Sequence, residues 1–276
     1  MSPDLLPPPG RDGIDRAGCG ASTGASGELL TAGPAFVPRP AQGRVFTAGR
    51  GIRSTDATRD GWLRRDALAR YLQDVAEDDL ADAGWREPQF WLLRRAAVTV
   101  RRYPRLGDRV TLSTFCSATG PRWAERTTTL ATTDGDLVQT VALWVAVTRS
   151  DGRPAALTSS FTSRYGPSAA GRTVSARLYH PGPPPEAAPR PWPVRATDFD
   201  TAGHVNNSVH WAAAEDVLAP LAWRPAYAEV EYHRPVLPGC EPSLRSTVSD
   251  GQAWAWLTDG GTRLASLRLD RTPDPK

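Results

Sequence analysis

The spacing of apolar residues in the first half of the chain predicts one long helix. Leu63, Ala67, Tyr71 and Val75 recur every four residues. Because an α-helix repeats every 3.6 residues, these side chains share one face. We therefore expect an amphipathic helix within residues 54–84.

Runs of β-branched and alternating apolar residues predict strands around this helix. Residues 122–149 read as a hairpin, because Asp134–Gly135 is a typical two-residue turn between apolar arms. Shorter runs of the same kind predict strands at 44–53, 97–103 and 108–118.

The pattern then restarts, which indicates an internal repeat. Gly107 stands five residues before Leu112, and Gly239 stands five residues before Leu244 in the second half. Each half therefore combines one helix with an antiparallel sheet, which predicts an α+β fold. The elements expected in the second half are a strand at 194–200, a helix at 204–221, strands at 226–233 and 241–250, and a hairpin at 253–270.

Differences in composition mark a linker between the two repeats and a tail before the first one. Seven of the thirteen residues at 181–193 are proline, which predicts a stiff extended linker. Residues 1–40 hold few large apolar side chains, so we expect a disordered tail. The predicted parts are a tail at 1–43, a first domain at 44–165, a linker at 166–193 and a second domain at 194–272.

The overall composition excludes several classes of protein. Hydrophobic residues make up 40% of the 276 residues, the formal net charge is +3, and only three Cys and four His are present. We expect no nucleic-acid partner, no metal site and no disulfide framework, and the cysteine spacing suits a reducing cytoplasm. The longest apolar runs are too short for a membrane span.

The stretch DFDTAGHVNN at residues 198–207 holds the strongest candidate chemistry. Asp200 can activate water as a general base or attack a carbonyl itself. The backbone N–H groups from Gly203 to Asn206 are expected at a helix N-terminus, where they favour negative charge and suit an oxyanion. His204 lies among them. An Asp before a helix is also a common N-cap, so a purely structural explanation stays open.

The same stretch resembles the signature of hotdog-fold acyl thioesterases. The doubled arrangement resembles the acyl-ACP thioesterases of plants and bacteria, and the first half, DATRDGWLRRDALARYLQDVAEDDLADAG, is similar to their N-terminal domain. The resemblance covers roughly residues 44–270. It implies two tandem hotdog domains that pair as an intrachain pseudo-dimer, with the catalytic residues in the second half and the acyl pocket shaped by the first.

The resemblance places the family's motif Asp on Asp200 and its motif His on His204. The plant enzymes have an Asn at the position of Ala202 and an acidic residue at the position of Pro235. Both side chains are therefore absent here. A simpler mechanism remains, in which Asp200 acts with the helix N-terminus near Gly203 while His204 and Asn206 position groups by hydrogen bonds.

Two further acids are weaker candidates for a role in catalysis. Glu215 is expected about three turns into the second helix, and Glu231 lies on the strand that follows it. A solvated or structural role is the ordinary explanation for each of them.

The acyl chain needs an apolar pocket, which we expect between the first helix and the sheet. An ordinary core role is the alternative for the apolar residues. The candidates for substrate binding are Trp62, Leu68, Tyr71, Leu72, Val75 and Asn207.

The arginine-rich segment at 94–109 is a candidate surface for the carrier. Arg101, Arg102 and Arg105 suit the acidic surface of an acyl carrier protein or the phosphates of coenzyme A. A solvated strand edge, whose positive charges discourage aggregation, is the alternative.

These observations lead to one functional hypothesis and one alternative. We expect a cytoplasmic thioesterase that needs no cofactor and hydrolyses fatty acyl-ACP or acyl-CoA, and that forms a homodimer if two chains associate. The alternative is a non-catalytic double-hotdog protein that binds acyl chains or an acyl-carrier partner. A hotdog dehydratase fits the HVNN pattern less well.

Overall fold

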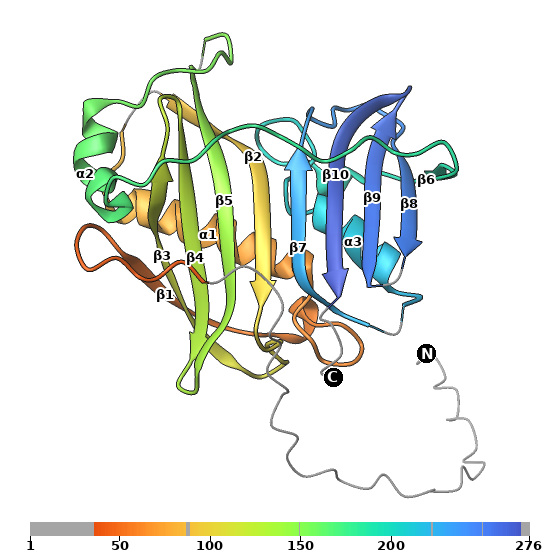
Figure 1. Ribbon diagram of the computed structural model, residues 1–276, viewed down its shortest axis with the longest axis horizontal. Helices are drawn as coiled ribbons and strands as arrows, with labels where there is room; N and C mark the ends of the chain where they lie inside the picture. The colour runs from red at the N-terminus through yellow and green to blue at the C-terminus, as the bar shows by residue number, and fades with distance from the viewer. Residues whose placement is uncertain (1–35, 87–88, 149, 222, 250, 272–276) are drawn as a thin grey trace, which may run out of the picture.

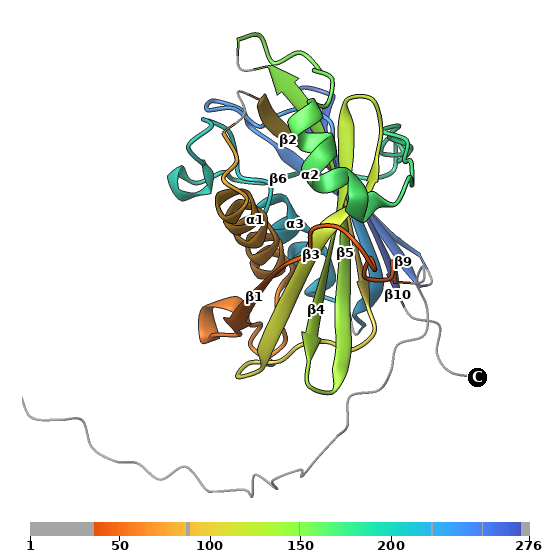
Figure 2. The same cartoon turned by 90° about the vertical axis from the view of Figure 1, so that its left-hand side faces the viewer.

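The computed structural model describes residues 36–86, 89–148, 150–221, 223–249 and 251–271, so most of the predicted tail lies outside the described residues. Ten strands form one antiparallel sheet, and the helices α1 and α3 lie against one of its faces (Figures 1 and 2). The helices are α1 Arg65–Asp82, α2 Ser159–Ala169 and α3 His210–Leu218, with 3-10 turns η1 Ser54–Asp56 and η2 Ala196–Asp198. The strands are β1 Phe46–Gly51, β2 Gln89–Val100, β3 Arg109–Thr119, β4 Trp123–Thr132, β5 Gly135–Thr148, β6 Arg190–Pro191, β7 Pro225–Tyr232, β8 Ser243–Ser249, β9 Gln252–Asp259 and β10 Thr262–Arg271.

The strand order reveals the internal repeat. It runs β1-β3-β4-β5-β2-β7-β10-β9-β8-β6, so the second half mirrors the first across the β2–β7 junction. Gly107 and Gly239, which precede β3 and β8, both have positive φ, at 92° and 87°. Glycine adopts this conformation without steric cost, which explains why the repeat keeps it. The predicted α+β fold of two hotdog halves is confirmed.

Both halves contribute to one large hydrophobic core on the helical side of the sheet. Val98 of β2 and Val230 of β7 belong to it, and each is 3% exposed or less. Full burial of a side chain of this size contributes about 1.5–3 kcal/mol, so the halves stabilise one another. The helices add Ala67, Leu68, Tyr71 and Val75 from α1 and Trp211, Ala213, Ala214 and Val217 from α3.

The first helix occupies the later part of the range that the apolar pattern predicts. α1 starts at Arg65, which lies within the predicted range of 54–84, and residues 54–64 of that range are not part of the helix. Gly61 has a φ of 82°, and an isolated bridge pairs Ala57 with Leu63. A left-handed residue and a bridge both interrupt helical hydrogen bonding, so residues 57–64 form a loop.

Two other elements also differ from the sequence expectation. Residues 196–198 form the 3-10 turn η2, so the strand predicted at 194–200 is wrong. α2 was not predicted, because its Ser, Gly and Pro167 give a weak helical pattern. The Thr158 hydroxyl accepts a hydrogen bond from the Phe161 amide and caps α2. The helix runs across residue 166, where the sequence suggested that the linker begins.

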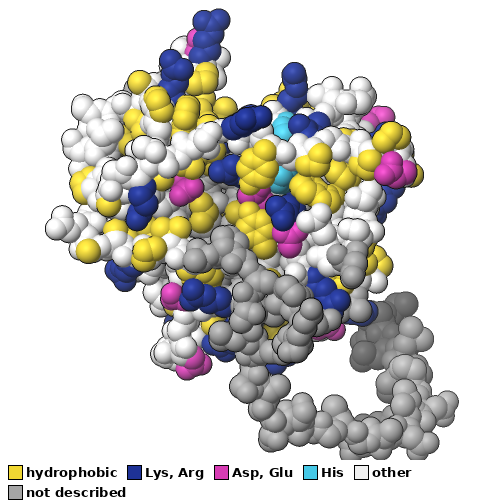
Figure 3. Space-filling view, in the orientation of Figure 1, with side chains coloured by type: hydrophobic (Ala, Val, Ile, Leu, Met, Phe, Trp, Pro, Cys, Tyr) yellow, Lys and Arg dark blue, Asp and Glu magenta, His cyan; other side chains and the backbone are white. Residues whose placement is uncertain are grey.

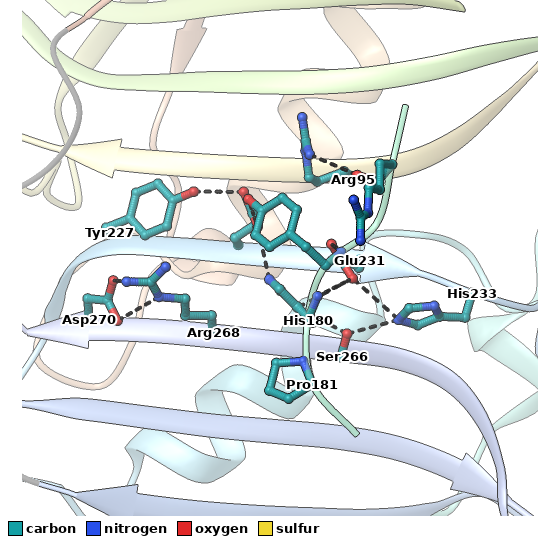
Figure 4. A network of polar contacts seen from close by, with 12 residues as sticks. Arg95, His180, Pro181, Tyr227, Glu231, His233, Ser266, Arg268 and Asp270 are labelled. Atoms are coloured by element: carbon teal, nitrogen blue, oxygen red, sulfur yellow. Dashed lines mark hydrogen bonds and ion pairs between the residues drawn. The ribbon is translucent and has the colours of Figure 1, made fainter. Parts of the chain in front are cut away.

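The proline-rich linker lies across the outer face of the sheet, opposite α1 and α3 (Figure 1). The amides of Tyr179 and His180 donate to the Glu231 carboxylate at 2.7 and 3.0 Å. The Tyr179 hydroxyl and the His180 ring contact Glu229 at 2.6 and 2.9 Å (Figure 4). We call these four residues the linker clasp. The linker is extended, as predicted, and it is also fastened to β7.

The chain just before β1 is held against the same sheet. The Gln139 side chain of β5 pairs with both backbone groups of Val37, at 2.6 and 2.9 Å. The Arg101 guanidinium lies 3.7 Å from the centroid of the Phe36 ring. Residues 36 and 37, which the sequence assigned to the tail, therefore contact the fold. No helix in the described ranges is both long and apolar enough to cross a membrane.

The linker clasp predicts how stability depends on pH. Burial opposes ionisation of Glu229, yet hydrogen bonds from His180, Tyr179 and Tyr227 hold its pKa below the ordinary value of 4.5. A carboxylate with a lowered pKa stabilises the fold above its ordinary value, and this contribution is lost as the pH falls through the folded value. Glu229→Gln should lower the free energy of unfolding by about 2 kcal/mol near pH 7.

Urea denaturation of both proteins between pH 3 and pH 7 measures this effect. The difference between wild type and variant should shrink below about pH 4.5. Glu186→Gln, on an exposed linker residue, is the control and should stay within about 0.5 kcal/mol of wild type. A constant difference across this range would contradict an ionised Glu229.

Candidate active site

A tight loop between η2 and α3 presents the motif residues. The Asp200 amide donates to the carbonyl of His204 at 3.0 Å, and the Gly203 amide returns to the carbonyl of Asp200 at 3.0 Å. Gly203 has a φ of 80°, which permits this reversal. The Asn206 amide donates to the Asp198 carbonyl and closes the loop.

The Asp200 carboxylate is held by its own loop. Oδ1 accepts from the Ala202 amide at 2.9 Å, and Oδ2 accepts from the Asn206 side-chain amide at 3.3 Å. The His204 ring lies farther away, with Nδ1 at 3.7 Å from Oδ1. Both side chains are about one quarter exposed. The carboxylate is therefore oriented, and it keeps lone pairs for a further partner.

Asn206 is itself fixed in orientation. Its Oδ1 accepts from the amide and the hydroxyl of Ser208, at 2.9 and 2.7 Å. Its Nδ2 is thereby turned toward Asp200.

His210 lies next to this loop, and burial lowers the pKa of its ring to about 4, so the ring is neutral near pH 7. His210 Nδ1 lies 3.3 Å from the Asn206 carbonyl and supports the loop from below.

The predicted oxyanion donors require a correction. The amides of Gly203 and Asn206 already donate to Asp200 and Asp198, and the Val205 amide donates to Val236. These N–H groups are consequently not available to a ligand. α3 begins only at His210, several residues later than predicted.

The motif loop opens onto one large pocket of about 760 Å³. Its wall is mainly apolar and comes mostly from the first half, so the pocket lies where the two halves meet. Cys116 in this wall is not a nucleophile, because burial raises the pKa of its thiol to about 11. Lining residues include Gln73, Ala76, Glu77, Leu80, Leu92, Ala124, Trp144, Phe161, Tyr165, Asp200, His204, Asn206, Asn207 and His233.

The residues expected to bind substrate lie elsewhere, with the exception of Asn207. The pocket side of α1 carries Gln73, Ala76, Glu77 and Leu80, which lie three or four residues apart on one face. The most apolar face of the same helix packs into the core instead. Trp62, Leu68, Tyr71, Leu72 and Val75 do not line the large pocket, and Tyr71 donates a hydrogen bond to Asp56 at 2.7 Å.

The first half contains the same loop without the candidate chemistry. The Thr58 amide donates to the carbonyl of Trp62 at 2.7 Å, which reproduces the contact between Asp200 and His204. By position, Thr58 replaces Asp200 and Trp62 replaces His204. A single carboxylate site in a duplicated fold follows from this difference.

Bulky side chains close the space beside this first loop. Trp62 lies between two guanidinium groups, with Arg105 at 4.1 Å and Arg224 at 4.6 Å from the ring centroid. The adjoining cavity holds only about 10 Å³, and Arg65 and Tyr103 form part of its wall. This volume is far below that of a substrate pocket.

The weaker acidic candidates are both engaged in structural contacts. Glu215 Oε1 accepts from the amide and the guanidinium of Arg65, at 2.9 and 3.0 Å. Glu231 belongs to the linker clasp on the outer face of the sheet. Neither residue lines the large pocket beside Asp200.

The predicted carrier arginines lie at the other end of β2 from the pocket. Arg102 is 3.7 Å from Asp134, and Arg105 covers Trp62. Arg94, which lines the pocket, is six residues before the end of β2 at Val100, so roughly 20 Å of strand separate the pocket from the chain at Arg101 and Arg102. The structure thus brings Arg94, and not Arg101, Arg102 or Arg105, to the candidate site.

One group of described residues has donor atoms close enough to hold a metal ion. It consists of His180, Glu229 and Glu231, whose ligand atoms lie within 4.8 Å of one another. Both carboxylates already accept hydrogen bonds from the linker, and the Tyr227 hydroxyl donates to Glu229 at 2.7 Å. The group is satisfied as a hydrogen-bonded clasp.

Comparison with known proteins identifies the family. The acyl-ACP thioesterase N-terminal domain matches residues 43–165, and the acyl-ACP thioesterase C-terminal domain matches residues 184–256. This chain belongs to the acyl-ACP thioesterase family. Its family membership agrees with the resemblance noted in the DFDTAGHVNN stretch and in the first half of the sequence.

Relatives of this thioesterase family member occur in Mycobacterium tuberculosis. An uncharacterized protein found in two strains is 31% identical over 214 residues, which cover 76% of this chain and 86% of the relative. The 12:0-ACP thioesterase of Umbellularia californica has the same fold, with a TM-score of 0.72 at 21% identity over 83% of this chain and 98% of that one. A putative oleoyl thioesterase of Lactobacillus plantarum superposes with a TM-score of 0.71 at 18% identity, over 86% and 99% of the two chains.

The contact between Arg65 and Glu215 predicts a structural role for this acid. Arg65 is 8% exposed, so loss of its partner leaves a buried guanidinium without a countercharge. Glu215 is 24% exposed, and this partial exposure weakens the effect. Glu215→Gln should lower the free energy of unfolding by about 1–3 kcal/mol and leave thioester hydrolysis unchanged.

Denaturant unfolding and steady-state kinetics of the same preparations measure the two effects. The control is Asp216→Asn on the exposed neighbouring residue, which should change neither quantity. Lost hydrolysis at unchanged stability would instead place Glu215 in the catalytic machinery.

Proposed function

We propose that this chain hydrolyses fatty acyl thioesters of acyl carrier protein or coenzyme A to the free fatty acid and the carrier thiol. The observation that carries the proposal is the Asp200 carboxylate, which is oriented by its own loop and opens onto an apolar pocket of about 760 Å³. An apolar pocket of this size suits an acyl chain, and a carboxylate at its wall suits attack on the acyl carbonyl.

Asp200 is proposed to act as a general base. Its carboxylate takes a proton from a water molecule, and the resulting hydroxide adds to the thioester carbonyl carbon. The tetrahedral intermediate then collapses, the C–S bond breaks, and the departing thiolate receives the proton from Asp200. Asn206 supports this role, because its amide holds one oxygen of the carboxylate and leaves lone pairs for water.

The developing oxyanion needs one donor beyond those named from the sequence, because the amides of Gly203, Val205 and Asn206 already donate within the fold. The amide of Asn207 has no hydrogen-bond partner among the described residues, and Asn207 lines the pocket. The His204 amide is likewise without a partner in the described part of the chain. We assign these two N–H groups to the oxyanion. Gly203 shapes the loop, and the His204 ring borders the carboxylate.

The acyl chain is proposed to lie along the pocket wall that the first half of the protein forms. The pocket side of α1 supplies Ala76 and Leu80, while the sheet supplies Leu92 and Trp144. Phe161 of α2 lines its wall as well. These apolar side chains exclude water along the acyl chain and place the thioester at the carboxylate of Asp200.

The arm that links the acyl chain to its carrier is proposed to leave the pocket on the outer face of the sheet. Arg94 and Arg234 line the pocket, and the guanidinium of Arg94 donates to the His233 carbonyl at 3.3 Å. In the described ranges, neither arginine has a carboxylate within ion-pair distance. Arginine and histidine side chains are visible together on this face (Figure 3). The surface at Arg101, Arg102 and Arg105 is the alternative carrier site.

Two departures from the family pattern, one in the motif and one after β7, support a second function. Ala202 stands where the plant enzymes carry Asn, and Pro235 stands where they carry an acid. A protein with the same pocket and no turnover would bind acyl chains or an acyl carrier. The Asp200 variant below distinguishes the two functions.

Asp200→Asn should lower kcat for acyl-ACP and acyl-CoA hydrolysis by at least about 100-fold, because an amide is not a base at this position. Asn keeps the shape of the side chain, so the variant should unfold at nearly the same temperature as wild type. Thiol release from a panel of chain lengths measures the rate.

The matched control is Asp198→Asn in the same loop. The Asp198 carboxylate accepts from the Arg195 amide, a contact that Asn retains, and it does not line the pocket. Its rate should stay within about threefold of wild type. Thiol release by Asp200→Asn at the wild-type rate would exclude Asp200 as the base, and a wild type that releases no thiol would favour the binding function.

Two double variants compare the carrier surfaces. Arg94→Ala with Arg234→Ala should raise KM for acyl-ACP about tenfold at low salt, and the effect should shrink in 0.5 M salt because ions screen exposed charges. Arg101→Ala with Arg102→Ala should leave KM nearly unchanged. A larger effect from the second pair would move the carrier to the opposite end of β2.

A further inference from the structure

A chain of polar groups runs from the linker clasp through His180 and Ser266 to His233 (Figure 4). Glu229 Oε1 contacts His180 Nε2 at 2.9 Å, and His180 Nδ1 contacts the Ser266 hydroxyl at 3.0 Å. The same hydroxyl contacts His233 Nε2 at 3.0 Å. The His180 ring and Ser266 are inaccessible to solvent, whereas the His233 side chain is 13% exposed and lines the pocket.

This chain fixes the orientation of the His233 ring. Nε2 is committed to Ser266, with the Glu231 carboxylate also close at 3.7 Å. Nδ1 has no hydrogen-bond partner in the described part of the chain. For either tautomer of the two histidine rings, Nε2 of His233 is bonded to Ser266, so Nδ1 is the ring nitrogen that remains for a ligand.

The position of His233 argues against a contact with the attacking water. Tyr232 faces the helical side, where its hydroxyl donates to the Asn207 carbonyl at 3.1 Å. Side chains alternate along an extended chain, so His233 faces the outer side together with Glu231. Asp200 and its loop belong to the helical side. His233 therefore stands where the carrier arm is proposed to leave the pocket.

From this geometry we infer that His233 Nδ1 hydrogen-bonds a secondary amide of the pantetheine arm of the substrate. The inference rests on the proposed function. The acyl chain offers no polar group, and the thioester carbonyl is assigned to the His204 and Asn207 amides on the helical side of the sheet. Acyl carrier protein and coenzyme A share an arm with two amides, and each amide offers both an N–H and a C=O group to a ring nitrogen.

The surroundings keep this nitrogen available. Burial, together with the charges of Arg263 and Arg94, lowers the pKa of His233 to about 4, so the ring stays neutral near pH 7. The Arg94 guanidinium donates to the His233 carbonyl at 3.3 Å and holds the backbone in place. His233 is thus a positioning residue for the carrier arm and takes no part in the chemical step.

Two substitutions separate the two ring nitrogens. Gln places its amide near the position of Nε2, so His233→Gln keeps the contact with Ser266 and loses the contact with the arm. Asn places its amide near the position of Nδ1, so His233→Asn does the reverse. A purely structural role for His233 would make His233→Asn the more damaging variant in every assay.

The probe is an S-dodecyl pantetheine thioether, which cannot be hydrolysed, with S-dodecyl mercaptoethanol as the amide-free control. Calorimetric titration should show that His233→Gln binds the pantetheine probe about five- to tenfold more weakly than wild type, whereas His233→Asn stays within about twofold. Neither variant should change binding of the control probe. Thermal unfolding should rank the variants in the opposite order, with His233→Asn the less stable.

With acyl-pantetheine as substrate, the same loss in His233→Gln should appear in KM, with kcat unchanged. Equal weakening by both variants, an equal loss with the amide-free probe, or wild-type indifference between the two probes would each overturn the inference. Because the thioether titration requires no turnover, it tests His233 even if no thioester is hydrolysed, and that failure would count against the proposed function alone.

Discussion

The antiparallel pairing of β2 with β7 joins the two halves of this protein into one sheet. Only residues 95–99 of β2 pair with β7, although β2 pairs with β5 along nearly its whole length. β2 therefore extends past the junction, and within the described ranges no strand pairs with its first residues on the β7 side. The large pocket occupies this region, and the Asp200 loop meets it from the second half. The size and position of the pocket depend on this short junction between strands of unequal reach.

The duplicated loops show how one fold presents the candidate side chains in only one of its halves. Both loops keep the same backbone hydrogen bonds, so the framework does not distinguish them. The side chains do: Asp200 and His204 border open space, whereas Trp62 is enclosed between arginines. Differences in a few side chains fill the space beside Trp62 and leave the space beside Asp200 open, while the topology of the two halves is the same.

The repeat and most strands could be predicted from the sequence, because alternation and turn chemistry are local properties. The hairpin of β4 and β5 forms as expected, although its turn is Thr133–Asp134 and Gly135 already belongs to β5, and Asp200 precedes a helix as expected. The pocket wall was not predictable in the same way. The apolar face of α1 packs in the core, so the pocket receives the face with Gln73 and Glu77, which the pattern marks as solvent-exposed. The hydrogen bonds that occupy the Gly203 and Asn206 amides also depend on tertiary structure.

The last strand of the sheet affects how copies of this protein can associate. β6 is only two residues long and ends in Pro191, which has no N–H to donate to a further strand. A short edge strand with proline is a poor template for strand addition. β6 is thus a poor site for strand addition, but it covers only Ser243 and Leu244, and residues 245–249 of β8 form the rest of this edge.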